Sequence, residues 1–109
     1  MKSPVPGQLK AARLAAGMTQ RQLGEHLGME PNLASARMTQ YEKGQHSPKF
    51  QLLKRLSDIL DVPVTYFYCE DNTASKLTMG LHRLDDKERQ QLLQDLQKRS
   101  SSDSDSSDA

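Results

Sequence analysis

The feature that most restricts the fold of this chain is a series of short apolar repeats at helical spacing, separated by glycines and prolines. Apolar residues three and four positions apart lie on one face of an α-helix. No run of strand length alternates apolar with polar residues. The pattern therefore predicts an all-α fold built from short helices.

The clearest start of a helix lies at Thr19. Thr19 and Gln22 have the spacing of a capping box, and Met18 before the cap can pack on Leu23 as a hydrophobic staple. Gly28 is expected to end this helix, because glycine adopts positive φ without a steric cost. The sequence thus predicts a helix that begins at Thr19 and stops at Gly28.

Further helices are predicted on both sides of this segment. The first runs from Gly7 or Gln8 to Ala16, the fourth starts at Ser47 and Pro48, and a short fifth runs from Val62-Pro63 to about Tyr68. The residues expected to face the core are Leu9, Ala12 and Ala16 in the first helix, Phe50, Leu53, Leu56 and Leu60 in the fourth, and Val64 and Phe67 in the fifth. Together with a third helix that ends at Gly44, they are predicted to form one small domain over residues 1–69.

Three segments are specific in combination. They are Arg13-Leu-Ala-Ala-Gly-Met-Thr-Gln-Arg-Gln-Leu-Gly, Tyr41-Glu-Lys-Gly-Gln-His-Ser-Pro, and Leu53 to Val62. Within residues 9–68 they resemble the phage repressor and Cro-like family of bacterial transcription regulators, also called XRE-type. The resemblance implies a five-helix, lambda-repressor-like helix-turn-helix domain that binds double-stranded DNA.

The resemblance also implies which residues contact the DNA. In this family the second helix lies on the DNA backbone, and the third places its side chains against base edges in the major groove. Gln20 resembles the family glutamine that contacts phosphate, whereas Arg13 and Glu42 match positions that commonly form a structural pair between helices one and three. The residues predicted to contact DNA are Gln20, Arg21, Asn32, Ser35, Ala36, Arg37, Thr39, Gln40, Lys43, Gln45 and His46.

Two of these residues suit particular bases. Donor and acceptor geometry in the major groove allows Arg37 to bind guanine and Gln40 to bind adenine. Alternatively, Arg37 holds a phosphate and Gln40 is a solvated surface residue. Lys43, Gln45 and His46 follow the helix and are expected to lie at the DNA backbone.

The chain departs from the family between Gly28 and Ser35, where about four residues exceed the usual short turn. In the favoured interpretation these residues lengthen the turn, and the third helix includes Ser35 to Lys43. In the second interpretation Pro31 is the first residue of a longer helix, so that Asn32 also approaches the DNA. The position of Asn32 therefore distinguishes the two.

The net charge of +1 conceals an uneven distribution of charge along the chain. Residues 1–68 hold nine Lys and Arg against five Asp and Glu, whereas residues 69–109 hold six against nine. Ordinary surface variation would also produce such a difference. However, Lys and Arg that neutralise phosphates supply most non-specific DNA affinity, so the distribution favours the first part of the chain as the part that binds DNA.

Several classes of function have no support in the sequence. The single cysteine, Cys69, excludes an internal disulfide and a cysteine-based zinc site, and the three histidines are too scattered for a metal-ligand motif. Asp85 and Asp86 suit the start of a helix better than a catalytic pair, so no enzyme, cofactor or small-molecule ligand is predicted. The chain lacks an apolar run of membrane-spanning length and a signal-peptide start, which predicts a cytoplasmic protein without a membrane partner.

The rest of the chain is predicted to be an appendage. Residues 70–75 have the composition of a linker, residues 76–83 suit a turn or two of helix, and a capping-box pattern at Asp85 starts a helix that runs to about Arg99. Its apolar residues are Leu77, Leu81, Leu84, Leu92, Leu93 and Leu96. Because exposed apolar side chains in such a stripe favour burial against another protein surface, the segment 70–99 is predicted to form a homodimer through residues 76–99.

Residues 100–109 contain only Ser, Asp and a final Ala, which predicts a disordered acidic tail.

These observations predict a sequence-specific transcriptional regulator, most simply a repressor that binds a palindromic operator. One alternative is an antitoxin that regulates its own operon and masks a toxin through residues 76–99. A second alternative is an adaptor that contacts the transcription machinery without reading DNA.

Overall fold

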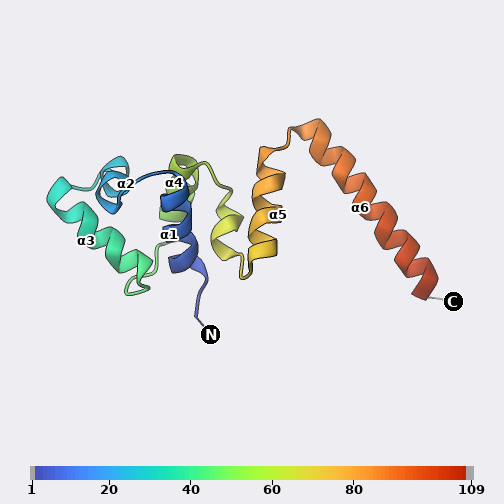
Figure 1. Cartoon of the computed structure of the whole chain (residues 1–109), viewed down its shortest axis with the longest axis horizontal. Coiled ribbons are helices and arrows are strands. Elements are labelled where there is room, and N and C mark those ends of the chain that lie inside the picture. Colours follow the sequence, from blue (N-terminus) through green and yellow to red (C-terminus); the bar gives the residue numbers. More distant parts are fainter. Residues whose placement is uncertain (1, 108–109) are drawn as a thin grey trace. The chain divides into compact units, whose positions relative to one another are not determined.

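The structure, a computed structural model, describes the backbone of residues 2–107 and the side chains of residues 2–101. Its helices are α1 (Val5–Ala15), α2 (Gln20–His26), α3 (Pro31–Glu42), α4 (Phe50–Leu60), the 3-10 helix η1 (Val64–Tyr68), α5 (Asn72–Arg83) and α6 (Asp86–Ser107) (Figure 1). The described residues contain no strand. The predicted all-α fold is therefore confirmed.

The core of the first five elements contains the predicted apolar positions except Ala16, Phe50 and Val64, of which Val64 is half-buried and packs against the core. Its buried residues are Val5, Leu9, Ala12, Leu23, Leu27, Met38, Leu53, Leu56, Leu60, Val62 and Phe67. The predictions for Ala16 and Phe50 were wrong. Ala16 follows the last residue of α1 and is exposed, and Phe50 is the first residue of α4 with 61% of its surface exposed. Both lie at helix ends, where the apolar face has turned away from the core.

The starts of α1 and α4 and the type of the short fifth helix also differ from the prediction. α4 begins at Phe50 after Lys49, so the predicted start at Ser47 and Pro48 was wrong. α1 begins at Val5, before the predicted start, because Pro6 lies in its first turn, where a missing N–H costs nothing. The short fifth helix is a 3-10 helix, which suits a segment of this length between two other elements. Its Phe67 is fully buried and completes the core as predicted.

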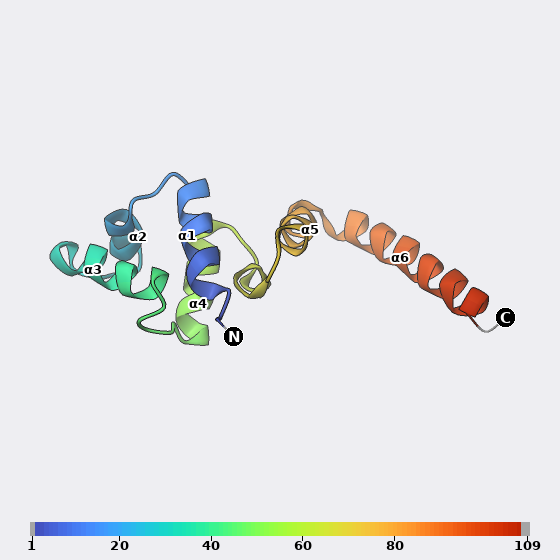
Figure 2. The same cartoon turned by 60° about the horizontal axis from the view of Figure 1, so that its bottom comes forward.

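α3 begins at Pro31, so the favoured interpretation of a longer turn was wrong. Residues 27–30 alone join α2 to α3, and Gly28 has a φ of +89° within this turn. The backbone N–H groups of Leu33 and Ala34 both donate to the Glu30 carbonyl at 2.9 Å, which closes the first turn of the helix. The additional residues therefore extend α3 at its N-terminus, and Asn32 belongs to the helix. Within the first part of the chain, α2 and α3 lie on the same side of α1 (Figures 1 and 2).

The chain divides into two compact units, residues 1–79 and 80–109. The first unit extends past the expected boundary at residue 69, because α5 starts at Asn72 and its first turns join the domain. The Gln8 side chain donates to Ser75 Oγ at 2.8 Å, and Met79 packs against the core. Asp71 caps α5 by accepting from the Ala74 N–H at 2.7 Å, so the predicted linker over residues 70–75 is largely helical.

The second unit consists mainly of α6. Its predicted capping box is confirmed, since the Glu88 N–H donates to Asp85 Oδ1 at 2.8 Å and the Asp85 N–H donates to Glu88 Oε1 at 3.1 Å. α6 continues past the expected end at Arg99 to Ser107. Residues 108–109 lie outside the described residues, and disorder of the acidic tail stays a prediction. No helix in the described part of the chain is long and apolar enough to cross a membrane.

Candidate nucleic-acid interface

The capping box at the start of α2 orients this helix. The Gln22 N–H donates to Thr19 Oγ1 at 3.0 Å, and the Thr19 N–H donates to Gln22 Oε1 at 2.8 Å. Two N–H groups that the helix leaves without intrahelical partners are therefore satisfied. As a result Gln20 is the first residue of α2, directly after the predicted cap residue Thr19.

A glycine sets the distance between α2 and α3. A Cβ atom at Gly24 would lie 2.6 Å from the Cβ atom of Ala34, closer than two carbon atoms can approach. Ala34 is completely buried. The two helices thus pack through their smallest side chains, and this contact holds α3 in one position against α2.

Arg13 and Glu42 form the predicted ion pair between α1 and α3. Arg13 Nε donates to Glu42 Oε2 at 2.7 Å, and Nη2 donates to Glu42 Oε1 at 3.0 Å. The third arginine nitrogen, Nη1, donates to the Met18 carbonyl at 2.9 Å. The two side chains are only 9% and 3% exposed. The pair is thus bidentate and buried, which fixes the end of α3 against α1.

The ion pair extends into a network that includes two predicted DNA contacts. Gln20 Nε2 donates to Glu42 Oε1 at 3.2 Å, and the Thr39 hydroxyl donates to Gln20 Oε1 at 2.8 Å. Thr39 and Gln20 are both half-buried. Consequently, one of the two N–H donors of the Gln20 amide remains for an outside partner, and the Thr39 side chain faces the protein.

Hydrogen bonding to Glu42 raises the pKa of Arg13, burial opposes this shift, and the negative charge of Glu42 adds to it. Arginine is already protonated at every accessible pH. The raised pKa therefore means that Arg13 keeps its charge, and the network keeps its donors, throughout the working pH range.

The outer face of α3 carries polar side chains without partners. Asn32, Ser35, Ala36 and Arg37 are exposed, and Gln40 is half-buried. Among the described residues, none provides a hydrogen bond or ion pair to the side chains of Asn32, Ser35, Arg37 or Gln40. The structure therefore brings together the α3 residues that the sequence proposed, except that Thr39 faces inward.

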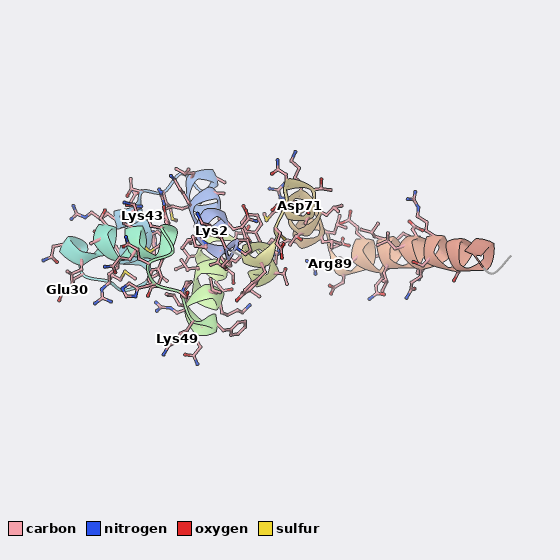
Figure 3. All side chains as sticks on the ribbon, turned by 90° about the horizontal axis from the view of Figure 1, so that it is seen from below. Lys2, Glu30, Lys43, Lys49, Asp71 and Arg89 are labelled. Atoms are coloured by element: carbon pink, nitrogen blue, oxygen red, sulfur yellow. The ribbon has the colours of Figure 1, made fainter. Side chains whose placement is uncertain are left out.

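The remaining predicted contacts flank this face. Lys43 follows the last residue of α3, and Glu30 precedes the first, so the two mark opposite ends of the helix (Figure 3). Gln45 and His46 are exposed in the turn after Gly44, which has a φ of +76°. Arg21 lies on α2 and forms an exposed ion pair with Glu25 at 2.9 Å.

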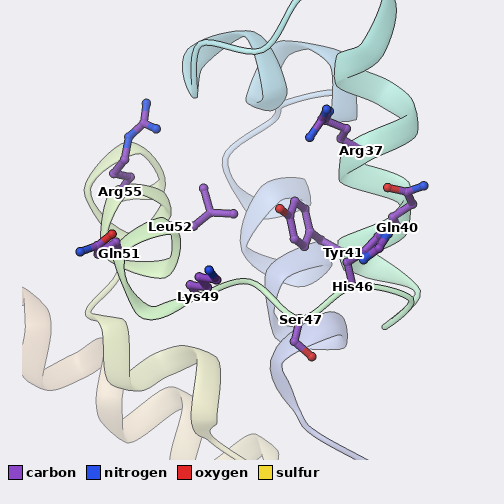
Figure 4. Close-up of a pocket in the computed structure, with 9 residues that line it drawn as sticks. All are labelled: Arg37, Gln40, Tyr41, His46, Ser47, Lys49, Gln51, Leu52 and Arg55. Atoms are coloured by element: carbon purple, nitrogen blue, oxygen red, sulfur yellow. The ribbon is translucent and has the colours of Figure 1, made fainter.

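A hollow between α3 and α4 was not anticipated from the sequence. It has a volume of about 500 Å³, and its walls include Arg37 from α3 together with Lys49, Gln51 and Arg55 at α4 (Figure 4). The sequence carried a weak signal, because residues 51 and 55 are polar and one helical turn apart. The sequence did not show, however, that this face of α4 points toward α3. No group of three or more His, Cys, Asp or Glu side chains that could hold a metal ion occurs in the part of the chain searched.

The fold and the site define a class of protein. Two helices joined by a tight turn, the first capped and the second with an exposed polar face, constitute a helix-turn-helix domain. A family model described as "Helix-turn-helix" matches residues 9–67. The chain therefore belongs to this family, which confirms the resemblance to phage repressor and Cro-like regulators.

Similar proteins carry the same description. Two of them are HTH-type transcriptional regulators of Sinorhizobium medicae (strain WSM419) and Rhizobium meliloti (strain 1021), each 34% identical over 64 residues. The match covers 59% of this chain and 43% of each relative, so the chain spans less than half the length of these two proteins. The crystal structure of transcriptional regulator BswR is also similar, with 36% identity and a TM-score of 0.81 over 86% of this chain and 93% of that protein.

Proposed function

We propose that this protein is a sequence-specific, non-enzymatic transcriptional regulator that inserts α3 into the major groove of DNA. One observation carries the proposal: the exposed face of α3 presents hydrogen-bonding side chains that no other part of the described chain satisfies. At the same time, the Gly24 contact and the Arg13 ion pair hold α3 rigidly against α2 and α1. A rigid helix with free polar groups suits base recognition, which requires accurate positioning.

The residues have distinct proposed roles. Arg37 and Gln40 bind guanine and adenine, respectively, while Asn32 and Ser35 extend the contact toward the N-terminus of α3. Ala36 offers a methyl group for contact with thymine. Flanking contacts to phosphate come from Arg21, Lys43, Gln45 and His46, and from the second N–H of the Gln20 amide. Thr39 positions Gln20 and does not reach the bases.

The regulator is proposed to act as a homodimer on a palindromic operator, most simply as a repressor that occludes a promoter in the cytoplasm. Leu77 and Leu81 on α5, and Leu92, Leu93 and Leu96 on α6, are exposed in the single chain. Exposed leucines at helical spacing favour burial against a second protein surface. The two-fold symmetry of such a dimer would match two half-sites.

A toxin is the alternative partner for these leucines. Co-purification of a toxin encoded by a neighbouring gene, instead of a second copy of this chain, would favour the antitoxin function.

The direct test combines selection from a random DNA pool with substitution of Arg37. We expect a defined sequence to be enriched, and we expect Arg37→Ala to weaken binding to it by about 1–3 kcal/mol while binding to random DNA changes little. Lys43→Ala serves as the matched control, since loss of a phosphate contact weakens both complexes equally. A pool without any enriched sequence would contradict the proposal and favour an adaptor.

A further inference from the structure

The hollow between α3 and α4 has an unusual charge composition. Three permanent cations line it, namely Arg37 from α3, Lys49 before α4 and Arg55 within α4, together with His46 from the intervening turn. No Asp or Glu side chain belongs to its wall. Cations gathered without a counter-charge repel one another, and this repulsion is relieved when an anion binds among them.

Among the described residues, two of the three permanent cations have side chains without partners. The side chains of Arg37 and Lys49 form no hydrogen bond or ion pair with any described side chain or carbonyl group. Arg55 is different, because its Nη2 donates to the Leu27 carbonyl at 2.8 Å. This single bond holds the guanidinium beside the end of α2 and leaves the other N–H donors available. Arg55 is therefore oriented in advance of ligand binding.

Two largely apolar side chains lie at the floor of the hollow. Leu52 and the ring of Tyr41, both half-buried, project from α4 and α3 into the space between the helices (Figure 4). A low-dielectric wall concentrates the field of the surrounding cations into the opening. The hollow thus combines a positive rim with the largely apolar side chains of Leu52 and Tyr41 at its base.

We propose that this hollow binds a phosphate of the DNA backbone, held by Arg55 and Lys49, next to the bases that α3 reads. The assignment rests on the proposed function of α3. Phosphate fits because arginine offers a planar pair of donors and lysine a point charge. The backbone is the source because Arg37 and Gln40 line both the hollow and the exposed side of α3, so a ligand there lies beside bound DNA.

The test is the salt dependence of binding to a random-sequence duplex, measured by fluorescence anisotropy in a series of KCl concentrations. The logarithm of the affinity falls linearly with the logarithm of the salt concentration, with a slope of about −0.9 for each phosphate contact. Because Arg55 and Lys49 share one phosphate, we expect Arg55→Gln and Lys49→Gln each to reduce the magnitude of the slope by up to about 0.9, and to weaken binding up to about tenfold at 0.1 M KCl. The variant with both substitutions should lose about 0.9 of the slope in total.

Two control variants separate charge from structure. Lys54→Gln removes one positive charge from the same helix outside the hollow, at a side chain that pairs with exposed Asp58 at 3.9 Å, and is expected to leave the slope unchanged. Arg55→Lys keeps the charge but alters the bond to Leu27, and is expected to retain the slope. Equal slopes for the unmodified chain, Arg55→Gln and Lys49→Gln would overturn the phosphate site while leaving DNA binding intact.

Two other outcomes also overturn the inference. Inorganic phosphate that competes with DNA more strongly than chloride at equal ionic strength, without any change of slope in Arg55→Gln, would assign the hollow to a free anion. Absence of binding to any duplex by the unmodified chain would overturn the proposed function as well. The two failures are therefore distinguishable.

Discussion

At the scale of single residues, Gly24 decides how closely α2 and α3 approach. Because Gly24 has no side chain, Ala34 can pack directly against it. A Cβ atom at position 24 would lie 2.6 Å from the Cβ atom of Ala34. The close contact involves backbone as well, because Ala34 Cα would lie at 3.0 Å from the same atom. Neither residue contributes an apolar periodicity, and for that reason the contact was not recognisable in the sequence.

The first prediction concerns Gly24→Ala. The added methyl group forces the two helices apart, and we expect the free energy of unfolding to fall by about 1–3 kcal/mol in urea titrations. Gly7→Ala is the matched control, since a Cβ atom on α1 at that position meets nothing within 4 Å. It should leave the protein equally stable or more stable by up to about 1 kcal/mol. Equal effects of both substitutions would contradict this interpretation.

The ion pair of Arg13 and Glu42 is the second place where a single residue strongly affects the stability of the fold. Its side chains are almost completely buried, whereas the pair of Arg21 and Glu25 is 63% and 41% exposed. Removal of one partner of a buried pair leaves the other charge without compensation. Loss of one partner should therefore lower the stability more in the buried Arg–Glu pair than in the exposed one.

The second prediction compares Glu42→Gln with Glu25→Gln. We expect Glu42→Gln to lower the free energy of unfolding by about 3–5 kcal/mol. For the exposed pair the expected loss is at most about 1 kcal/mol. Because the pKa of Arg13 is raised in the folded state, its stabilising effect is complete below its ordinary pKa and is lost only as the pH rises through the raised value. The stability lost in Glu42→Gln should thus be the same at neutral and at moderately alkaline pH. A decline of this loss over that range would contradict the prediction.

At the scale of elements, α3 illustrates where periodicity succeeds and where it fails. Its end at Gly44 was predicted, because a glycine stop is visible in any sequence. Its start at Pro31 was not favoured, because the first turn packs through Ala34 against a glycine. Proline suits the first position of a helix as well as it suits a turn. Local rules therefore allowed both interpretations.

The third prediction concerns α6. Leu92 and Leu96 lie one turn apart and are exposed, which favours their burial in a homodimer. We expect sedimentation to give twice the mass of one chain, and Leu92→Lys combined with Leu96→Lys to give the mass of a single chain. Gln94→Lys, an exposed polar position on the same helix, should leave the mass unchanged. A mass of one chain for the unmodified protein at micromolar concentration would exclude this dimer.

At the scale of the whole molecule, the buried core lies entirely within the first compact unit. Every residue of that core falls between Val5 and Phe67, and α5 adds Met79 to its edge. The sequence predicted a domain boundary at residue 69, because the polar segment that follows has the composition of a linker. The side chain of Asp71 instead caps α5, and the first turns of this helix pack on the domain.

The fourth prediction follows from this division. A chain of residues 1–84, which retains α5 and lacks α6, should fold cooperatively and sediment as a monomer. Its thermal midpoint should be independent of protein concentration, whereas that of the full chain should rise with concentration because assembly stabilises the folded state. Circular dichroism melts at several concentrations provide the measurement. An unfolded 1–84 chain would show that α6 belongs to the first folding unit.

The sequence alone determined the helix-turn-helix domain, the caps of α2 and α6, most of the core and the candidate residues on α3. These features follow from local rules, since side-chain spacing, glycine stops and capping residues act within a few positions along the chain. Only the tertiary structure decided that the turn is short and α3 is long, that Gln20 and Thr39 bond within the protein, and that α4 completes a basic hollow. Each of these depends on which surfaces of distant helices meet, and contact distances between helices leave no periodic pattern in the sequence.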